Sequence, residues 1–205
     1  MRKLVVGTFV SLDGVMQAPG GPDEDRSGGF EHGGWLVPHF DEAMGQTMVE
    51  RTQQADGLLL GRKTYEIFAA HWPRAGDDDP IAAKLNRVRK YVVSTTLDTV
   101  EWNNSTLISR DVAGAVAELK RQPGGEIQVT GSGELIQTLM RHDLVDEYRL
   151  LVFPVLLGSG KRLFAEGTMP AALELADTTT SSTGVAIQTY RRAGELQRGS
   201  FALEQ

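Results

Sequence analysis

Three consecutive leucines, Leu58, Leu59 and Leu60, restrict the fold of this chain more than any other feature. Successive side chains of a strand point to opposite faces, so such a run fits a strand that is buried on both faces. Gly61 follows and permits a tight turn, and residues 62–70 have the composition of a short helix. A strand covered on both sides that runs directly into a helix indicates an α/β protein whose helices flank the sheet.

The start of this helix is a candidate anion site. The free N–H groups and the dipole of a helix start favour negative charge, and Arg62, Lys63 and Thr64 add donors that suit a phosphate. The alternative is an ordinary strand-to-helix junction with two solvated cations, which the motif alone does not exclude. A P-loop is excluded because its lysine directly follows the second glycine, whereas Arg62 stands there in this chain.

Length and composition narrow the class of protein. The 205 residues fit one domain, predicted over residues 1–193, with a tail at 194–205. The chain has no apolar run long enough for a membrane span and no signal-peptide pattern, so we expect a cytoplasmic protein without a membrane partner. The net charge of −6 gives no basic surface for nucleic acid.

The absence of cysteine removes several kinds of site. Disulfides, thiolate zinc sites, iron–sulfur clusters and cysteine nucleophiles are all excluded in a chain with no cysteine. The four histidines show no metal-ligand spacing, so we expect no metal site. A hydrolase is also disfavoured because the G-x-S-x-G motif is missing.

Strand and helix patterns alternate along most of the chain. A helix over residues 39–54 is predicted to turn Phe40, Met44 and Met48 toward the core, and Asp79 and Asp111 are predicted helix N-caps. The glycine-rich stretch 15–34 reads as a lid or binding loop, or else as a disordered insertion. Strands are expected at 3–12, 57–60, 90–94, 106–109, 126–130 and 146–152, with a terminal hairpin of 173–179 and 185–191.

Two further strand ends carry candidate site residues. Asp13 and Gly14 follow the first strand, where ligands of α/β sheets usually bind, although the pair also fits a plain turn. The segment 131–133, Gly-Ser-Gly, forms a second strand-to-helix junction. It begins like a dinucleotide-binding fingerprint, but Ile136 replaces the third glycine, so a standard Rossmann site is not supported.

Five short motifs occur in a specific order, each next to the appropriate predicted element. They are Ser11-Leu12-Asp13-Gly14, Gly61-Arg62-Lys63-Thr64, Ser94-Thr95, Gly131-Ser132-Gly133 and the stretch 154–164. Through them, residues 2–192 resemble the dihydrofolate reductase-like superfamily. Within it, they resemble the C-terminal reductase domain of the bifunctional riboflavin-biosynthesis deaminase-reductases and its stand-alone relatives. The resemblance implies a three-layer α/β fold with a mixed, mostly parallel sheet and a C-terminal antiparallel hairpin.

The resemblance also implies NADPH as cofactor. Its adenosine phosphate and ribose would be held by Gly61, Arg62, Lys63, Thr64, Ser94 and Thr95, with Arg62 favouring NADPH over NADH. Its pyrophosphate would be held by Gly131, Ser132, Gly133 and Glu134. Asp13 is the candidate catalytic residue, for substrate orientation or proton delivery. The small-molecule substrate would contact Gly14, Trp72, Phe153 and Pro154.

The implied activity is hydride transfer to a small heterocyclic or carbonyl substrate, pyrimidine- or pterin-like, as in 5-amino-6-(5-phosphoribosylamino)uracil reductase. Dihydrofolate reductases carry a carboxylate on the first long helix, but Phe40 stands there and Asp41 follows it, about 100° further around the predicted helix. The missing cysteines exclude a zinc deaminase domain. The alternatives are an NADPH-binding module without activity and a true dihydrofolate reductase. The terminal hairpin and tail are expected to allow a homodimer.

Overall fold

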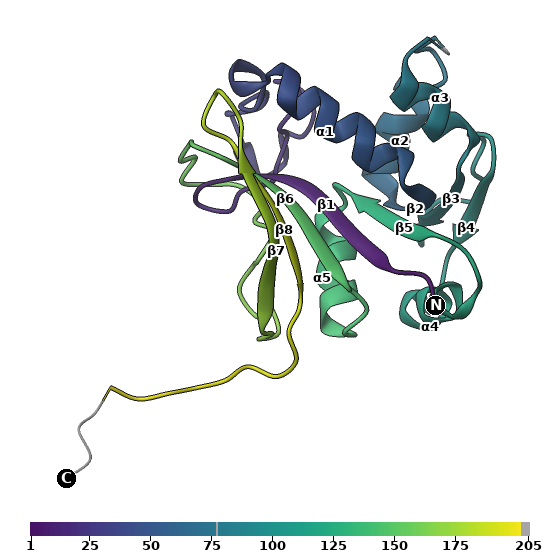
Figure 1. The fold of residues 1–205 in the computed structure, drawn as a ribbon. Helices are drawn as coiled ribbons and strands as arrows, with labels where there is room; N and C mark the ends of the chain where they lie inside the picture. The colour runs from purple at the N-terminus through teal and green to yellow at the C-terminus, as the bar shows by residue number, and fades with distance from the viewer. Residues whose placement is uncertain (77, 202–205) are drawn as a thin grey trace.

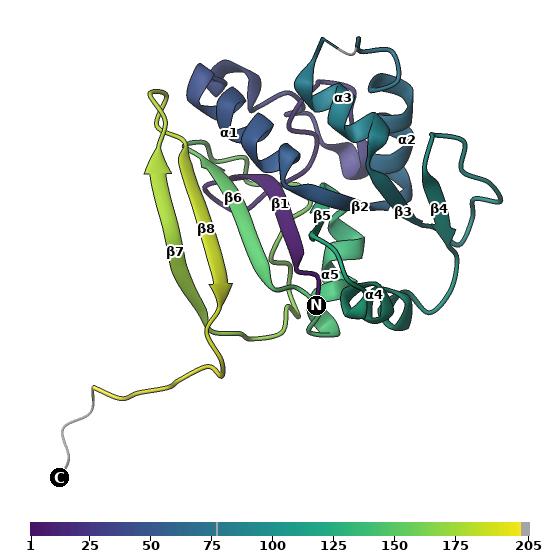
Figure 2. The same cartoon turned by 45° about the vertical axis from the view of Figure 1, so that its right-hand side comes forward.

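The computed structural model describes residues 1–76 and 78–201 and contains one eight-stranded sheet. The strand order is β4-β3-β2-β5-β1-β6-β8-β7, which Figure 2 shows from β7 at one edge to β4 at the other. Strands β1 to β6 pair in parallel, and β8 and β7 add an antiparallel hairpin next to β6. The predicted α/β fold with its mixed, mostly parallel sheet is confirmed. The strands are β1 (Leu4–Ser11), β2 (Ala55–Gly61), β3 (Arg89–Val93), β4 (Ser105–Ile108), β5 (Glu126–Thr130), β6 (Glu147–Phe153), β7 (Leu173–Thr180) and β8 (Ala186–Arg192).

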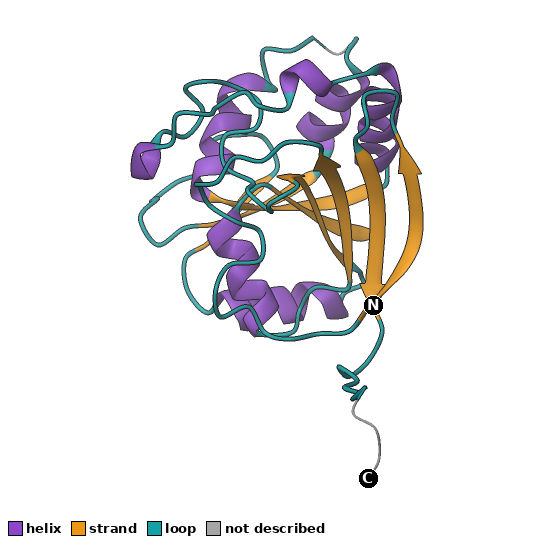
Figure 3. Ribbon diagram, turned by 90° about the vertical axis from the view of Figure 1, so that its left-hand side faces the viewer, coloured by secondary structure: helices purple, strands orange, loops and turns teal. Residues whose placement is uncertain are grey.

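Helices cover the sheet on both faces, as Figures 1 and 3 show. The predicted burial of the leucine run on both faces of its strand is confirmed, because Leu58, Leu59 and Leu60 are all buried. Leu59 packs in the core beneath α4 and α5, whereas Leu58 and Leu60 pack on the opposite face with residues of α2 and α3. The helices are α1 (Glu42–Gln53), α2 (Arg62–His71), α3 (Pro80–Arg87), α4 (Val112–Arg121) and α5 (Gly133–Arg141).

A third core lies between the C-terminal half of the sheet and the loop at residues 15–34. Phe30 and Trp35 pack there against Phe153 of β6 and Val185 before β8, with Met44 of α1. The loop is ordered by its own contacts, since the Trp35 indole donates to the Gln17 carbonyl over 2.8 Å. A short 3₁₀ turn, Ser27–Gly29, is its regular segment.

The first helix begins later than the sequence predicted. Asp41 is its N-cap and accepts a hydrogen bond from the Met44 amide, so Phe40 lies outside the helix with an extended backbone and a half-exposed side chain. The predicted inward stripe is therefore wrong at Phe40 and right at Met44, which is buried. The predicted caps Asp79 and Asp111 are confirmed, because both side chains accept amides of the first turn.

One edge of the sheet is open. All residues of β7 are exposed, including Leu175 at 50%, and β8 is the one strand that pairs with it among the described residues. The chain then leaves the body of the molecule, as Figure 1 shows for the residues after β8. The expected homodimer stays a prediction.

Among the described residues, no helix is long and apolar enough to cross a membrane.

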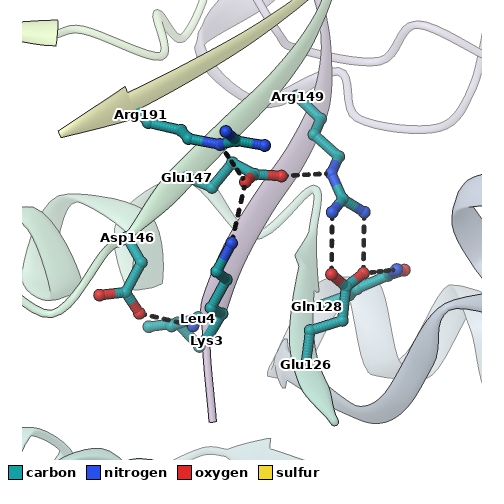
Figure 4. A network of polar contacts seen from close by, with 8 residues as sticks. All are labelled: Lys3, Leu4, Glu126, Gln128, Asp146, Glu147, Arg149 and Arg191. Atoms are coloured by element: carbon teal, nitrogen blue, oxygen red, sulfur yellow. Dashed lines mark hydrogen bonds and ion pairs between the residues drawn. The ribbon is translucent and has the colours of Figure 1, made fainter. Parts of the chain in front are cut away.

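A charged network links β5, β6 and β8, with β1 lying between β5 and β6 (Figure 4). Arg149 of β6 reaches across β1 and donates to both carboxylate oxygens of Glu126 on β5, each over 2.8 Å. Its Nε donates to Glu147 over 2.7 Å, and Glu147 also lies 3.2 Å from Arg191 and 3.7 Å from Lys3. The side chains of Arg149, Glu126 and Glu147 are only 12%, 13% and 3% exposed. Little water reaches these charges, so each is stabilised by its ion-pair partners.

Replacing Arg149 should therefore destabilise the fold strongly. Arg149→Ala leaves the Glu126 carboxylate without its bidentate partner, and breaking a buried ion pair costs about 3–5 kcal/mol. The matched control is Arg121→Ala, whose ion pair with Glu118 is exposed on both sides and should cost less than about 1 kcal/mol. Urea unfolding measures both variants. Equal losses would contradict the assigned role of the network.

Candidate functional site

The two predicted glycine junctions lie side by side at one end of the sheet. β2 and β5 are parallel neighbours, so the turns that follow them meet. The Gly61 amide donates to Ser132 Oγ over 2.9 Å, and the Ser132 amide donates to Thr64 Oγ1 over 3.1 Å. The Ser132 and Thr64 hydroxyl oxygens are 3.0 Å apart. The two turns are thus joined by direct hydrogen bonds.

The second turn, at residues 131–132, has a left-handed backbone. Gly131 and Ser132 both have left-handed φ values, 57° and 58°. A Cβ at Gly131 would lie 3.0 Å from Thr64 Oγ1, so a larger residue would press on the first junction. α5 starts at the next residue, and the Ile136 amide makes its first internal bond, to the Ser132 carbonyl over 3.0 Å. The amides of residues 133–135 precede that bond and form the helix start that favours an anion.

Arg62 connects the first junction to the turn after β3. Its Nε donates to Glu66 and its Nη1 donates to Thr96 Oγ1, both over 2.8 Å. The buried Ser94 shapes that turn, because its Oγ accepts the amides of Thr96 and Leu97. The structure thus brings Arg62 and the segment 94–96 together, with Thr95 exposed.

Sequence reasoning missed two residues of this group. Glu66 stands four residues after Arg62, a helical ion-pair spacing that could have identified it. Thr96 had no such signal because only the folded chain places it beside Arg62.

Lys63 and Glu134 sit at the starts of the two helices. The Lys63 side chain is 68% exposed, and its Nζ lies 3.7 Å from Asp25 Oδ1 in the 15–34 loop. Glu134 is exposed in the first turn of α5. Its carboxylate repels an approaching anion, so its backbone amide is the group that suits a phosphate there.

Asp13 is tied into the protein by several donors. Its Oδ1 accepts from the Ser11 hydroxyl over 2.7 Å and from the Leu157 amide over 3.1 Å, and its Oδ2 accepts from the Gly158 amide over 2.9 Å. Arg162 lies 3.5 Å from Oδ2. The Ser11 hydroxyl and the two amides lower the pKa of Asp13 to about 2. The carboxylate therefore joins the turns after β1 and β6.

Of the four predicted substrate contacts, Gly14, Phe153 and Pro154 lie at the neighbouring ends of β1 and β6, whereas Trp72 lies in another core. Gly14 and Pro154 lie in the turns that Asp13 joins, after β1 and β6. The Phe153 ring is fully buried against Phe9 and Trp35, so it contributes packing and not an exposed contact. Trp72 belongs to another core, at the C-terminal end of α2, where it packs against Phe68 and His71.

Two cavities lie near these elements, and the joined junctions line neither of them. The larger, about 640 Å³, lies between α2 and the segment 99–103 and is lined by Tyr65, Glu66, Ala69, Pro73, Asn86, Thr99, Glu101, Trp102 and Asn103. The smaller, about 270 Å³, lies between the 15–34 loop and the turn at 159–161. We place the candidate site at the two glycine junctions, because the groups that can bind an anion, the helix-start amides and the side chain of Arg62, lie there. In the described ranges 1–76 and 78–201, no cluster of histidine, aspartate or glutamate is arranged to hold a metal ion.

The sheet order, the paired junctions and the terminal hairpin define a dihydrofolate reductase-like fold. The chain belongs to the family of the RibD C-terminal domain, whose model matches residues 2–187. Among solved structures, a protein from Shewanella sp. PV-4 provisionally assigned to riboflavin biosynthesis superposes with a TM-score of 0.70 at 23% identity, covering 94% of this chain and 99% of that one. Dihydrofolate reductase from Enterococcus faecalis, solved with NADP(H), gives 0.58 at 14% identity, covering 94% and 97%.

The relatives by sequence include two proteins of Bacillus subtilis (strain 168). YyaP is 30% identical over 198 residues, which are 94% of this chain and 96% of YyaP. YwjB is 30% identical over 189 residues, which are 92% of this chain and 97% of YwjB. Both are described as uncharacterized, so they support the family and not a substrate.

Ser132 should stabilise the joined junctions. Ser132→Ala removes the acceptor of the Gly61 amide and the hydroxyl beside Thr64, which should lower the free energy of unfolding by about 1–2 kcal/mol. Ser159→Ala is the matched control, since Ser159 also lies between two glycines but is exposed. Denaturant unfolding compares the two, and a Ser159→Ala loss as large as that of Ser132→Ala would contradict the role of this hydroxyl.

Asp13 should give stability a specific pH dependence. Its pKa is about 2 in the folded protein, below the usual 3.8, so its contribution is complete above about pH 4 and is lost as the pH falls toward 2. Asp13→Asn should therefore be less stable than the wild type at pH 7, with a difference that shrinks below pH 4. Asp98→Asn, at an exposed position, should show no such convergence. Chemical unfolding from pH 7 to 2.5 tests this, and a pH-independent difference would contradict it.

Proposed function

We propose that this protein is an NADPH-dependent reductase that passes hydride to a small heterocyclic or carbonyl substrate of pyrimidine or pterin type. The observation that carries the proposal is the pair of joined junctions, which combines a helix start at residues 133–135 with Arg62 and Thr64. Membership of the RibD C-terminal domain family supports a reductase. The fold is shared with a dihydrofolate reductase solved with NADP(H) and with a pyrimidine reductase-like protein of Corynebacterium diphtheriae.

The residues at the junctions fit the cofactor by chemistry. Gly131 and Ser132 have a left-handed backbone, and the first amides of α5, at residues 133–135, would suit a pyrophosphate. Arg62 is half exposed and is positioned by Thr96 and Glu66, and its planar guanidinium suits the 2′-phosphate of NADPH. When bound, NADPH supplies the hydride, while the protein orients it and excludes water.

Asp13 would act in this reaction by positioning and not as an acid. Its carboxylate is fixed by Ser11, Leu157 and Gly158, and its low pKa leaves it ionised. It would hold the turns after β1 and β6 in place around the substrate. The proton that accompanies hydride transfer would then come from another group or from water.

A true dihydrofolate reductase is the less favoured alternative. Asp41, the acidic residue nearest to the pterin-binding position, caps α1 and accepts from the Ser182 amide and hydroxyl over 2.9 and 2.8 Å. Its carboxylate is committed to these contacts and is not directed at a substrate. An NADPH-binding module without activity is the other alternative. Assays of NADPH oxidation with pterins, ribosylaminopyrimidines and quinones would separate it from a reductase.

Arg62 should determine the choice between the two nicotinamide cofactors. Arg62→Ala should weaken NADPH binding about 10- to 100-fold, because a charge-assisted hydrogen bond contributes about 1.5–3 kcal/mol, and it should leave NADH binding nearly unchanged. Arg74→Ala, at an exposed arginine just beyond the other end of α2, is the control. Fluorescence titration with both cofactors measures the effect. Equal losses for NADPH and NADH would contradict the assignment of Arg62 to the 2′-phosphate.

A further inference from the structure

The loop at residues 15–34 is fixed to the turn at 159–161 by Gln17. The Gln17 side-chain amide donates to the carbonyls of Asp25 and Ser27 over 3.0 and 2.9 Å, and its Oε1 accepts the Lys161 amide over 3.0 Å. The backbone around Asp25 is thereby held at a defined place beside this turn. These contacts therefore fix where the Asp25 carboxylate lies.

The Asp25 carboxylate bridges two lysines from distant parts of the chain. Its Oδ2 lies 2.5 Å from Lys161 Nζ, and its Oδ1 lies 3.7 Å from Lys63 Nζ at the start of α2. The Ser27 hydroxyl donates to Oδ1 over 2.6 Å. Burial opposes the ionised form, but Lys161 and Ser27 outweigh it and lower the pKa of Asp25 to about 2. Asp25 is thus a permanent negative charge beside Lys63.

The two contacts differ in strength. Lys161 is close to the carboxylate and also donates to Ser27 Oγ over 2.7 Å, so it belongs to a compact hydrogen-bonded group. Lys63 is at the distance of a loose ion pair and is largely exposed, and such pairs contribute little. Lys63 can therefore leave Asp25 while Lys161 continues to hold the loop.

We infer that Asp25 is an internal competitor for Lys63 and limits the affinity of the neighbouring helix start for a phosphate-bearing ligand. This inference rests on the proposed function, in which that ligand is NADPH. A phosphate that approaches Arg62 and Lys63 meets two cations that already have carboxylate partners, Glu66 and Asp25. Binding requires Lys63 to exchange Asp25 for the phosphate. The acidic loop residue thereby sets the cofactor affinity without contacting the cofactor.

Asp25→Asn tests this competition directly. It removes the negative charge beside Lys63, so the variant should bind NADPH about two- to fivefold more tightly than the wild type at low salt, with the difference shrinking as salt is added. Asp23→Asn is the matched control in the same loop, because Asp23 is exposed and its ion pair is with Arg26. In a Lys63→Gln background, Asp25→Asn should have no further effect. Fluorescence titration measures the wild type and these four variants.

The outcomes separate the inference from the proposed function. Absence of NADPH binding by the wild type would overturn both. Binding by the wild type with unchanged or weaker binding by Asp25→Asn would overturn the inference alone, since weaker binding would mean that Asp25 supports the cofactor site by holding the loop. A gain in affinity that persists in the Lys63→Gln background would also overturn it, because the gain would not pass through Lys63.

Hydrogen exchange of the ligand-free protein tests the unequal contacts. Lys161→Gln and Asp25→Asn should both speed amide exchange in residues 22–29, because both break the compact group. Lys63→Gln should leave that exchange unchanged. Faster exchange in Lys63→Gln, to the extent seen in Lys161→Gln, would show that Lys63 holds the loop and would overturn the inference.

Discussion

The parallel pairing of β2 with β5 is the constraint on which the candidate site depends. Parallel neighbours end at the same side of a sheet, so the glycine turns that follow them must share one small volume. Ser132 occupies that volume and bonds to Gly61 and Thr64, while Gly131 avoids Thr64 only because it has no side chain. Two helix starts are thereby directed to the same place, and neither turn could form it alone.

The two cations at the start of α2, Arg62 and Lys63, are already paired within the protein, and so is Asp13 at the turn after β1. Arg62 forms an ion pair with Glu66, and Lys63 forms one with Asp25. Asp13 accepts several hydrogen bonds and also lies close to Arg162. Such pairing lets the fold place cations at a future phosphate site without leaving them unbalanced. It also means that a charged ligand must exchange partners when it binds, so its affinity depends on the strength of the internal pairs as well as on its own contacts.

Much of the architecture could be predicted because its signals are local. The buried leucines 58–60, the caps Asp79 and Asp111 and the strand end before Pro154 follow from backbone and side-chain chemistry within a few residues. The errors came from distant contacts. α1 begins at Glu42 because Asp41 caps it and also binds Ser182 of the terminal hairpin, and Phe153 turns inward because Trp35 and Phe9 surround it. Sequence spacing contains neither fact.

The sequence by itself determined the class of fold and the motifs of the anion site. A leucine run that needs cover on both faces, glycines at strand ends and cations at helix starts are properties of short segments. Only the tertiary structure decided how these parts are used. It joined the two glycine turns through Ser132, linked the turns after β1 and β6 through Asp13, and placed Asp25 beside Lys63. These contacts join residues far apart in the chain, and such contacts are set by the packing of the whole sheet.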